Sequence, residues 1–123
     1  MRYFMVLIVL SMASLAFAQE TTISKQAWIN GMQEKLPAAF CQEKQYFRQC
    51  FTVSEGECLR VASNATRVCL GNKQDQFPDV LVQPKDGSHW GGIVGECAGN
   101  AYEAALLEKR INSDKCNDVN NWI

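Results

Sequence analysis

Residues 88–111 read SHWGGIVGECAGNAYEAALLEKRI, and we expect the rest of the chain to pack around this segment. It predicts a helix from His89 or Gly92 to Ile111, with Ser88 as a candidate N-cap. At about 100° per residue, small and apolar side chains occupy two opposite sides of that helix. One side holds Ile93, Cys97, Ala104, Leu107 and Ile111, and the other holds Gly91, Gly95, Gly99, Tyr102 and Leu106. Two such sides predict a helix that packs against neighbours on both.

The three glycines spaced four residues apart are the most unusual feature of this helix. A glycine inside a helix costs about 1 kcal/mol relative to alanine, so a compensating gain is expected. Either the backbone of another helix comes close, or the face is a groove for a partner's chain or a ligand, with aromatic edges. Membrane insertion is a third interpretation, and Glu96 and Glu103 oppose it. The candidate binding residues are Trp90, Gly91, Gly95, Gly99 and Tyr102.

Two helices are predicted within residues 24–51. The first spans residues 24–36 and carries an apolar stripe, after which Pro37 breaks it or begins the next helix. The second spans residues 37–51, because proline suits the first helical position and three phenylalanines align on one side. The stripe consists of Trp28, Ile29, Met32 and Leu36, and the phenylalanines are Phe40, Phe47 and Phe51.

The third predicted helix, residues 54–71, has the clearest boundaries. Ser54 and Glu57 have the spacing of a capping box, in which each side chain satisfies a backbone N–H of the first turn. Gly71 is placed to end the helix in a left-handed turn. Residues 52–54 form a short link to the second helix, and this predicts an antiparallel helical hairpin.

Residues 72–87 form a polar connection, which is long for a helical domain of this size. Two prolines interrupt it, and the run Val80, Leu81, Val82 predicts a strand-like segment or one turn of helix. The predicted fold is all-α. It is a small disulfide-stapled bundle of about four helices around the central hairpin, with one long irregular connection.

The chain has six cysteines, and residues 1–18 have the pattern of an export signal, described below. An even number of cysteines in a small exported chain predicts three disulfides. Zinc is the competing interpretation, and neither the spacings, which contain no C-x-x-C, nor the single histidine favours it. Within continuous helices Cys41 cannot reach Cys50 and Cys58 cannot reach Cys69, because nine residues already rise about 13 Å and a disulfide needs Cα atoms within about 7 Å. A bond between Cys97 and Cys116 is also awkward, so we expect each of these two to bond to the hairpin.

Residues 1–18 have the pattern of a cleaved secretory signal peptide. Arg2 precedes an apolar block, and Ala16, Phe17 and Ala18 form a small-x-small cleavage site. The block is shorter than the roughly 20 residues of a membrane span. Residues 19–123 are then expected to form a single helical, disulfide-rich domain of the periplasm or the extracellular space.

The charge of the mature chain narrows the classes of partner. Without Arg2, eleven basic residues face 13 acidic ones, a net charge of −2. The basic residues form no block or stripe, so we expect neither nucleic-acid binding nor stable membrane insertion. Residues 117–123 are polar until Trp122 and Ile123, which either dock on the core or form a small exposed anchor for a partner.

No credible catalytic, metal or cofactor site emerges from the sequence. His89 is the natural general base, and Asp86 and Ser88 lie beside it, but turn and capping chemistry explains this group more simply. We therefore expect an exported non-catalytic protein-binding module, namely an inhibitor, accessory subunit or chaperone-like factor. The alternatives are a small secreted hydrolase that uses His89 and a membrane-active secreted toxin.

Overall fold

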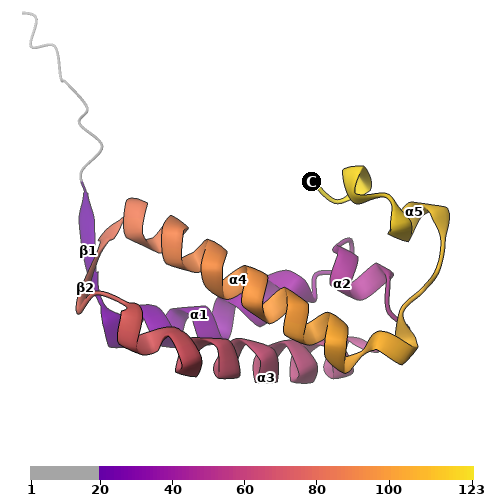
Figure 1. The fold of residues 1–123 in the computed structure, drawn as a ribbon, viewed down its shortest axis with the longest axis horizontal. Helices are drawn as coiled ribbons and strands as arrows, with labels where there is room; N and C mark the ends of the chain where they lie inside the picture. The colour runs from indigo at the N-terminus through magenta and orange to yellow at the C-terminus, as the bar shows by residue number, and fades with distance from the viewer. Residues whose placement is uncertain (1–19) are drawn as a thin grey trace, which may run out of the picture.

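The computed structural model describes residues 20–123, so the predicted signal peptide lies outside the described residues. This part of the chain is mostly helical and holds three disulfides, which confirms the helical prediction, but a small two-stranded sheet is also present. Figure 1 shows the sheet at one end of three long helices and the C-terminal segment at the other. The α-helices are α1 (Lys25–Phe40), α2 (Tyr46–Gln49), α3 (Glu55–Lys73), α4 (Lys85–Ala105) and α5 (Asp114–Asn117).

Helix α1 continues through Pro37 to Phe40, and the predicted break at Pro37 is wrong. Ser24 caps its start by accepting a hydrogen bond from the Ala27 backbone N–H at 3.2 Å. Proline removes one intrahelical donor, but here its ring is buried and its carbonyl accepts from the Cys41 N–H at 3.0 Å. The helix therefore loses a single bond close to its end and gains apolar contact.

The predicted helix over residues 37–51 is also wrong, because the chain turns between α1 and the four-residue α2. Arg48 holds this turn through a hydrogen bond from its guanidinium to the Cys41 carbonyl at 3.0 Å. The turn brings Cys41 beside Cys58 at the start of α3, a pairing that a continuous helix would not provide.

Helix α3 begins at the predicted cap, since the Ser54 hydroxyl accepts from the Glu57 N–H at 3.1 Å. The other half of the predicted capping box is replaced, because the Glu57 carboxylate accepts from Nζ of Lys109 at 2.6 Å. It does not end at Gly71, and no glycine of the described residues has a positive φ. The helix passes Gly71 and ends at Lys73, followed by the 3₁₀ turn η1 (Gln74–Gln76). The chain leaves this turn at Phe77, whose buried ring packs edge-on against Trp28 at 5.1 Å.

The predicted irregular connection between α3 and α4 is largely ordered structure. Strand β2 (Val80–Gln83) pairs antiparallel with β1 (Thr21–Ser24), and Ile23 lies opposite Leu81. Leu81 is fully buried beneath the sheet. The strand-like interpretation of residues 80–82 is therefore confirmed, whereas its partner strand was not predicted.

Helix α4 begins at Lys85 and ends at Ala105, earlier at both ends than predicted. Ser88 lies inside the first turn, and its N–H bonds to the Pro84 carbonyl at 2.9 Å, so it is not the N-cap. After the helix, the Ile111 N–H donates to the Cys50 carbonyl at 2.8 Å, and the Lys109 carbonyl accepts from the Thr52 N–H at 2.8 Å. This pairing with the segment after α2 replaces the last predicted turns of the helix.

Helix α3 lies along both α1 and α4, so α1, rather than residues 37–51, forms the first arm of the helical hairpin (Figure 1). The buried side chains form two clusters. One includes Trp28, Leu70, Leu81 and Val94 near the sheet, and the other includes Phe51, Val61 and Tyr102 near α2.

Three disulfides join separate elements across this core. The pairs are Cys41 with Cys58, Cys50 with Cys116, and Cys69 with Cys97. None of the pairs excluded from the sequence forms. Cys97 and Cys116 each bond to a cysteine within residues 41–69, in agreement with the expected attachment to that part of the chain.

Candidate functional site

The three glycines of α4 do not share one environment. A Cβ atom added at Gly91 or Gly95 would meet no neighbouring atom within 4 Å. At Gly99 it would lie 3.2 Å from Cζ of Phe47, so only this glycine permits a close approach, and the approaching group is a side chain. The expectation that another helix backbone lies against all three glycines is wrong.

The two aromatic residues expected at the edges of a groove also lie in different places. Tyr102 is fully buried, and its hydroxyl donates to the Phe47 carbonyl at 2.7 Å, so it is a core residue. Trp90 is half-buried near the other end of α4 and packs against the Phe77 ring at 5.2 Å. Trp90, Gly91, Gly95, Gly99 and Tyr102 therefore do not form a single groove.

We expect Gly95→Ala to raise the free energy of unfolding by about 0.5–1 kcal/mol, because alanine favours the helix and the site has room for a methyl group. Gly99→Ala is the matched control. Its Cβ would press on Phe47, so the gain there should be smaller or reversed. Urea unfolding of both variants, followed by circular dichroism, measures the difference. Equal gains would contradict the environments described above.

His89 and Asp86 make separate contacts at the start of α4. His89 is exposed on the second turn of α4, where a turn was expected. The Asp86 carboxylate accepts from the Val82 N–H at 2.7 Å and thereby ties the first turn of α4 to β2. Residues 20–123 contain no group of three or more side chains suited to hold a metal ion. Within the same residues, no helix is long and apolar enough to span a membrane.

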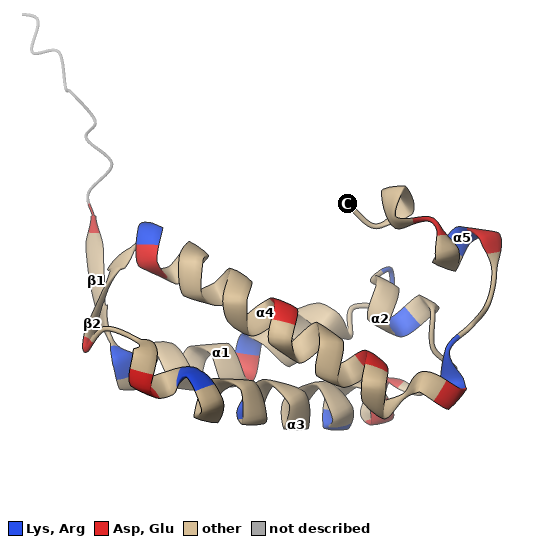
Figure 2. Cartoon of the chain, viewed as in Figure 1, with Lys and Arg blue, Asp and Glu red and all other residues tan. Residues whose placement is uncertain are grey.

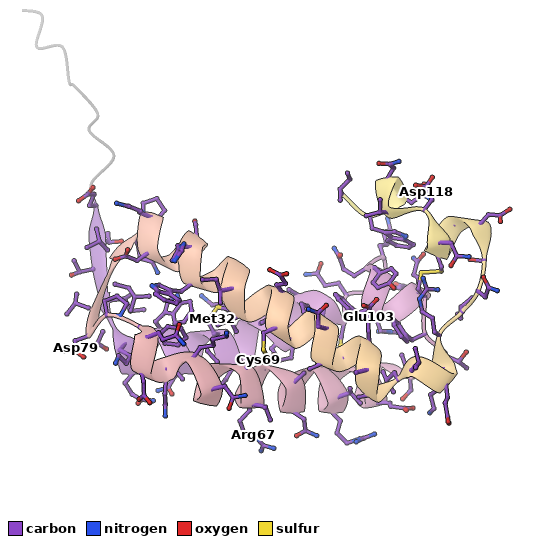
Figure 3. The ribbon with its side chains drawn as sticks, in the orientation of Figure 1. Met32, Arg67, Cys69, Asp79, Glu103 and Asp118 are labelled. Carbon is purple, nitrogen blue, oxygen red and sulfur yellow. A yellow bond between two sulfur atoms is a disulfide. The ribbon has the colours of Figure 1, made fainter. Side chains whose placement is uncertain are left out.

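A cleft of about 400 Å³ lies between α2, the C-terminal half of α4 and the C-terminal segment. We call it the C-terminal cleft. Its lining residues are Gln45, Tyr46, Phe47, Glu103, Cys116, Asn117, Val119, Trp122 and Ile123. In Figure 3, Glu103 lies on α4 near α2, and Asp118 marks the C-terminal segment on the opposite side.

The C-terminal segment is held in place by several independent bonds. The disulfide from Cys50 to Cys116 anchors α5, and the Trp122 indole N–H donates to the Lys115 carbonyl at 3.1 Å. The Trp122 ring meets the Tyr46 ring at 5.6 Å and an interplanar angle of 67°. Trp122 therefore forms a fixed wall of the cleft.

A polar network underlies this wall. The Tyr46 hydroxyl donates to Oε1 of Glu103 at 2.5 Å and accepts from Nε of Arg110 at 3.0 Å. Arg110 also donates to the carbonyls of Ile111 and Cys116. Burial raises the pKa of Tyr46, and the hydrogen bond to Glu103 acts in the same direction, so Tyr46 remains a donor at neutral pH.

The rim of the cleft is apolar and open to solvent. Val119 is 69% exposed and Ile123 is 94% exposed. Single exposed apolar residues are ordinary, but these two flank a cleft with three aromatic rings in its lining. The arrangement can hold an apolar group and, at Glu103, a hydrogen-bond donor or a positive charge.

Most of this site was missed from the sequence, because its residues come from three separate segments. Glu103 was noted as evidence against membrane insertion and was not placed in a cleft. The one signal that pointed to the site was the terminal pair Trp122 and Ile123, which was given two interpretations. The Trp122 side chain is partly buried against Tyr46, in line with docking on the core, and Ile123 is exposed.

Residues 22–110 match a family model described as "NttA: T2SS substrate NttA". Comparisons with curated proteins and with solved structures give no match. The matched range includes β2, all of β1 except Thr21, all three long helices and α2. It ends before α5, so Cys116, Val119, Trp122 and Ile123 of the cleft lie beyond it.

Proposed function

The chain belongs to the NttA family of T2SS substrates, and from this premise we propose that it is an exported non-catalytic protein that binds another protein through the C-terminal cleft. Family membership indicates export to the periplasm or the extracellular space, and three disulfides are consistent with an oxidising compartment. The kinds of protein that we consider are an inhibitor, an accessory subunit and a chaperone-like factor.

The C-terminal cleft is the observation that carries this proposal. Its walls are held by a disulfide, by the network at Tyr46 and by the Trp122 indole bond, so little ordering is needed when a ligand binds. Preorganised sites of this kind lose less free energy to immobilisation on binding. Hot spots of protein interfaces are rich in tryptophan and tyrosine, and Trp122 and Tyr46 both line this cleft.

The polar side chains of the cleft support a role in binding rather than in catalysis. The Tyr46 hydroxyl is engaged on both sides, by Glu103 and by Arg110. Glu103 is the one carboxylate side chain in the lining, whereas the common mechanisms of glycoside hydrolysis need two. Charges elsewhere are dispersed, with Lys and Arg scattered over the helices (Figure 2), which fits a small specific contact better than a broad electrostatic surface.

Site-specific photo-cross-linking tests the proposal. A photoreactive phenylalanine analogue is placed at Val119, on the rim of the cleft, and in a second protein at Val80, which is 53% exposed on β2. Each protein, oxidised and folded, is irradiated with proteins of the compartment to which it is exported. We expect one adduct of defined mass from position 119, absent from position 80 and lost on Trp122→Ala. Absence of an adduct at 119, or the same adducts at both positions, would refute the proposal.

A further inference from the structure

The charge of the C-terminal cleft points to the kind of group that its partner presents. Glu103 is the one charged side chain among the nine lining residues. It forms no ion pair within residues 20–123, where the ion pairs are Lys25 with Asp79 and Lys109 with Glu57. A carboxylate offers about four acceptor positions, and the described hydrogen bond from Tyr46 uses one of them. Glu103 therefore retains acceptor capacity for a donor that enters the cleft.

The aromatic rings around Glu103 favour a planar cation. The Tyr46 and Trp122 rings meet edge to face at 67°, and the Tyr46 hydroxyl donates to the carboxylate. Nζ of Lys115 lies 5.2 Å from the Trp122 ring centroid, so this ring already contacts a cation. The fold already stacks a guanidinium here, since Cζ of Arg110 lies 5.4 Å from the Tyr46 ring centroid. Arg110 itself is not in the lining, and four acceptors engage it: the Tyr46 hydroxyl, the Ile111 and Cys116 carbonyls and the Asn117 side chain.

Arginine meets these requirements better than lysine does. A guanidinium can lie flat on an aromatic face while its edge donates two hydrogen bonds, whereas an ammonium is a compact and strongly hydrated charge. The apolar stem of arginine also suits a rim formed by Val119 and Ile123. Resting on the proposed function, we infer that the C-terminal cleft binds an arginine side chain of the partner protein, with the guanidinium stacked on Trp122 and donating to Glu103.

Short blocked peptides test this inference independently of any partner. The probes are acetyl-Ala-Leu-X-Leu-Ala-amide with arginine, lysine or citrulline at X; citrulline keeps the size of arginine but lacks its charge. Binding to the full mature protein is followed by the NMR shift of the Trp122 indole N–H, which lies in the cleft. We expect saturable shifts with the arginine peptide and about tenfold or greater weakening with citrulline, as for loss of a charge-assisted hydrogen bond.

Protein variants supply the second arm of the experiment. Glu103→Gln removes the charge but keeps an acceptor for Tyr46, and we expect it to weaken the arginine peptide about tenfold or more. Glu96→Gln is the matched control, because Glu96 is exposed on the same helix and does not line the cleft. It should leave binding unchanged. Thermal unfolding of both variants checks that the fold is retained.

The outcomes separate this inference from the proposed function. Equal binding of the arginine and citrulline peptides, or equal binding of the arginine and lysine peptides, would overturn the choice of arginine. So would an unshifted Trp122 signal with every peptide. If position 119 still captures a partner in those cases, the proposed function stands and only the inference of an arginine ligand is wrong. If position 119 captures nothing while the arginine peptide binds through Glu103, the proposed function fails and the cleft is an arginine site without a protein partner.

Discussion

Replacement of both Cys50 and Cys116 by alanine should lower the free energy of unfolding by about 4 kcal/mol, the value that chain entropy assigns to a loop of this length. The two cysteines are 66 residues apart in sequence, the longest separation among the three disulfides. Their bond joins the end of α2 to α5 and so anchors the whole C-terminal segment. Urea unfolding with circular dichroism measures the loss.

The matched control is the double alanine variant of Cys41 and Cys58, whose separation is 17 residues. The same entropy relation assigns that loop about 3 kcal/mol, roughly 1 kcal/mol less than the longer one. Both pairs are buried, so the loss of side-chain packing is similar in the two variants. A larger loss of stability in the variant without Cys41 and Cys58 would show that chain entropy does not determine which disulfide contributes more.

The long-loop disulfide also determines whether the C-terminal cleft exists. Cys116 lines the cleft, and Trp122 is attached through the Lys115 carbonyl next to it. Without the disulfide, the Trp122 indole signal should move toward the position of an unstructured tryptophan, and cross-linking from residue 119 should be lost. The variant that lacks Cys41 and Cys58 should keep both signals if it folds. Retention of the cross-link without Cys50 and Cys116 would show that the other contacts suffice.

Tyr102→Ala should destabilise the protein by about 3–5 kcal/mol, the usual cost when a large aromatic side chain is removed from a core. Tyr102 is fully buried on α4, and three other rings surround it edge-on. The neighbouring rings are those of Phe40, Phe47 and Phe51, with centroids at 6.3, 5.0 and 5.2 Å. Thermal and urea unfolding measure the loss, which includes the cavity left among these rings.

Tyr102→Phe is the matched control, since it keeps the ring and removes only the hydroxyl. The Phe47 carbonyl then loses the donor at 2.7 Å, and an unsatisfied buried acceptor costs about 1–3 kcal/mol. We therefore expect an intermediate stability. If the two variants were equally unstable, the hydroxyl and not the ring would dominate this part of the core.

The same residue predicts a loss of stability in alkali. Burial raises the pKa of Tyr102 to about 12, and the charge of Glu57 acts in the same direction. In the unfolded chain a tyrosine titrates near 10, so the folded state holds this proton more tightly. The stability that the neutral hydroxyl supplies is complete below about pH 10 and is lost as the pH rises toward 12. The stability difference between wild type and Tyr102→Phe should therefore narrow over this range. Tyr46 is present in both proteins, so its contribution cancels from the difference.

The sequence by itself determined the features that depend on neighbouring residues. Ser54 was recognised as an N-cap because the capping box needs only four consecutive positions. The helical stripes predicted most of the long helices, and the even cysteine count predicted three disulfides. Export was also predicted, and the family match confirms it. These inferences hold because helix capping, helix periodicity and the redox state of the compartment are local or compositional properties.

Tertiary structure alone decided the features that depend on distant residues. Strand β1 exists because residues 21–24 meet β2 across the chain, and α1 passes through Pro37 because its ring is buried there. The exclusion of a bond between Cys41 and Cys50 agreed with the structure, although the continuous helix on which it rested does not form. The C-terminal cleft combines residues near 46, 103 and 122, which the pairing at Ile111, the disulfide at Cys116 and the contacts of Tyr46 bring together. No periodicity encodes such a site, because its contacts arise only after the helices have packed.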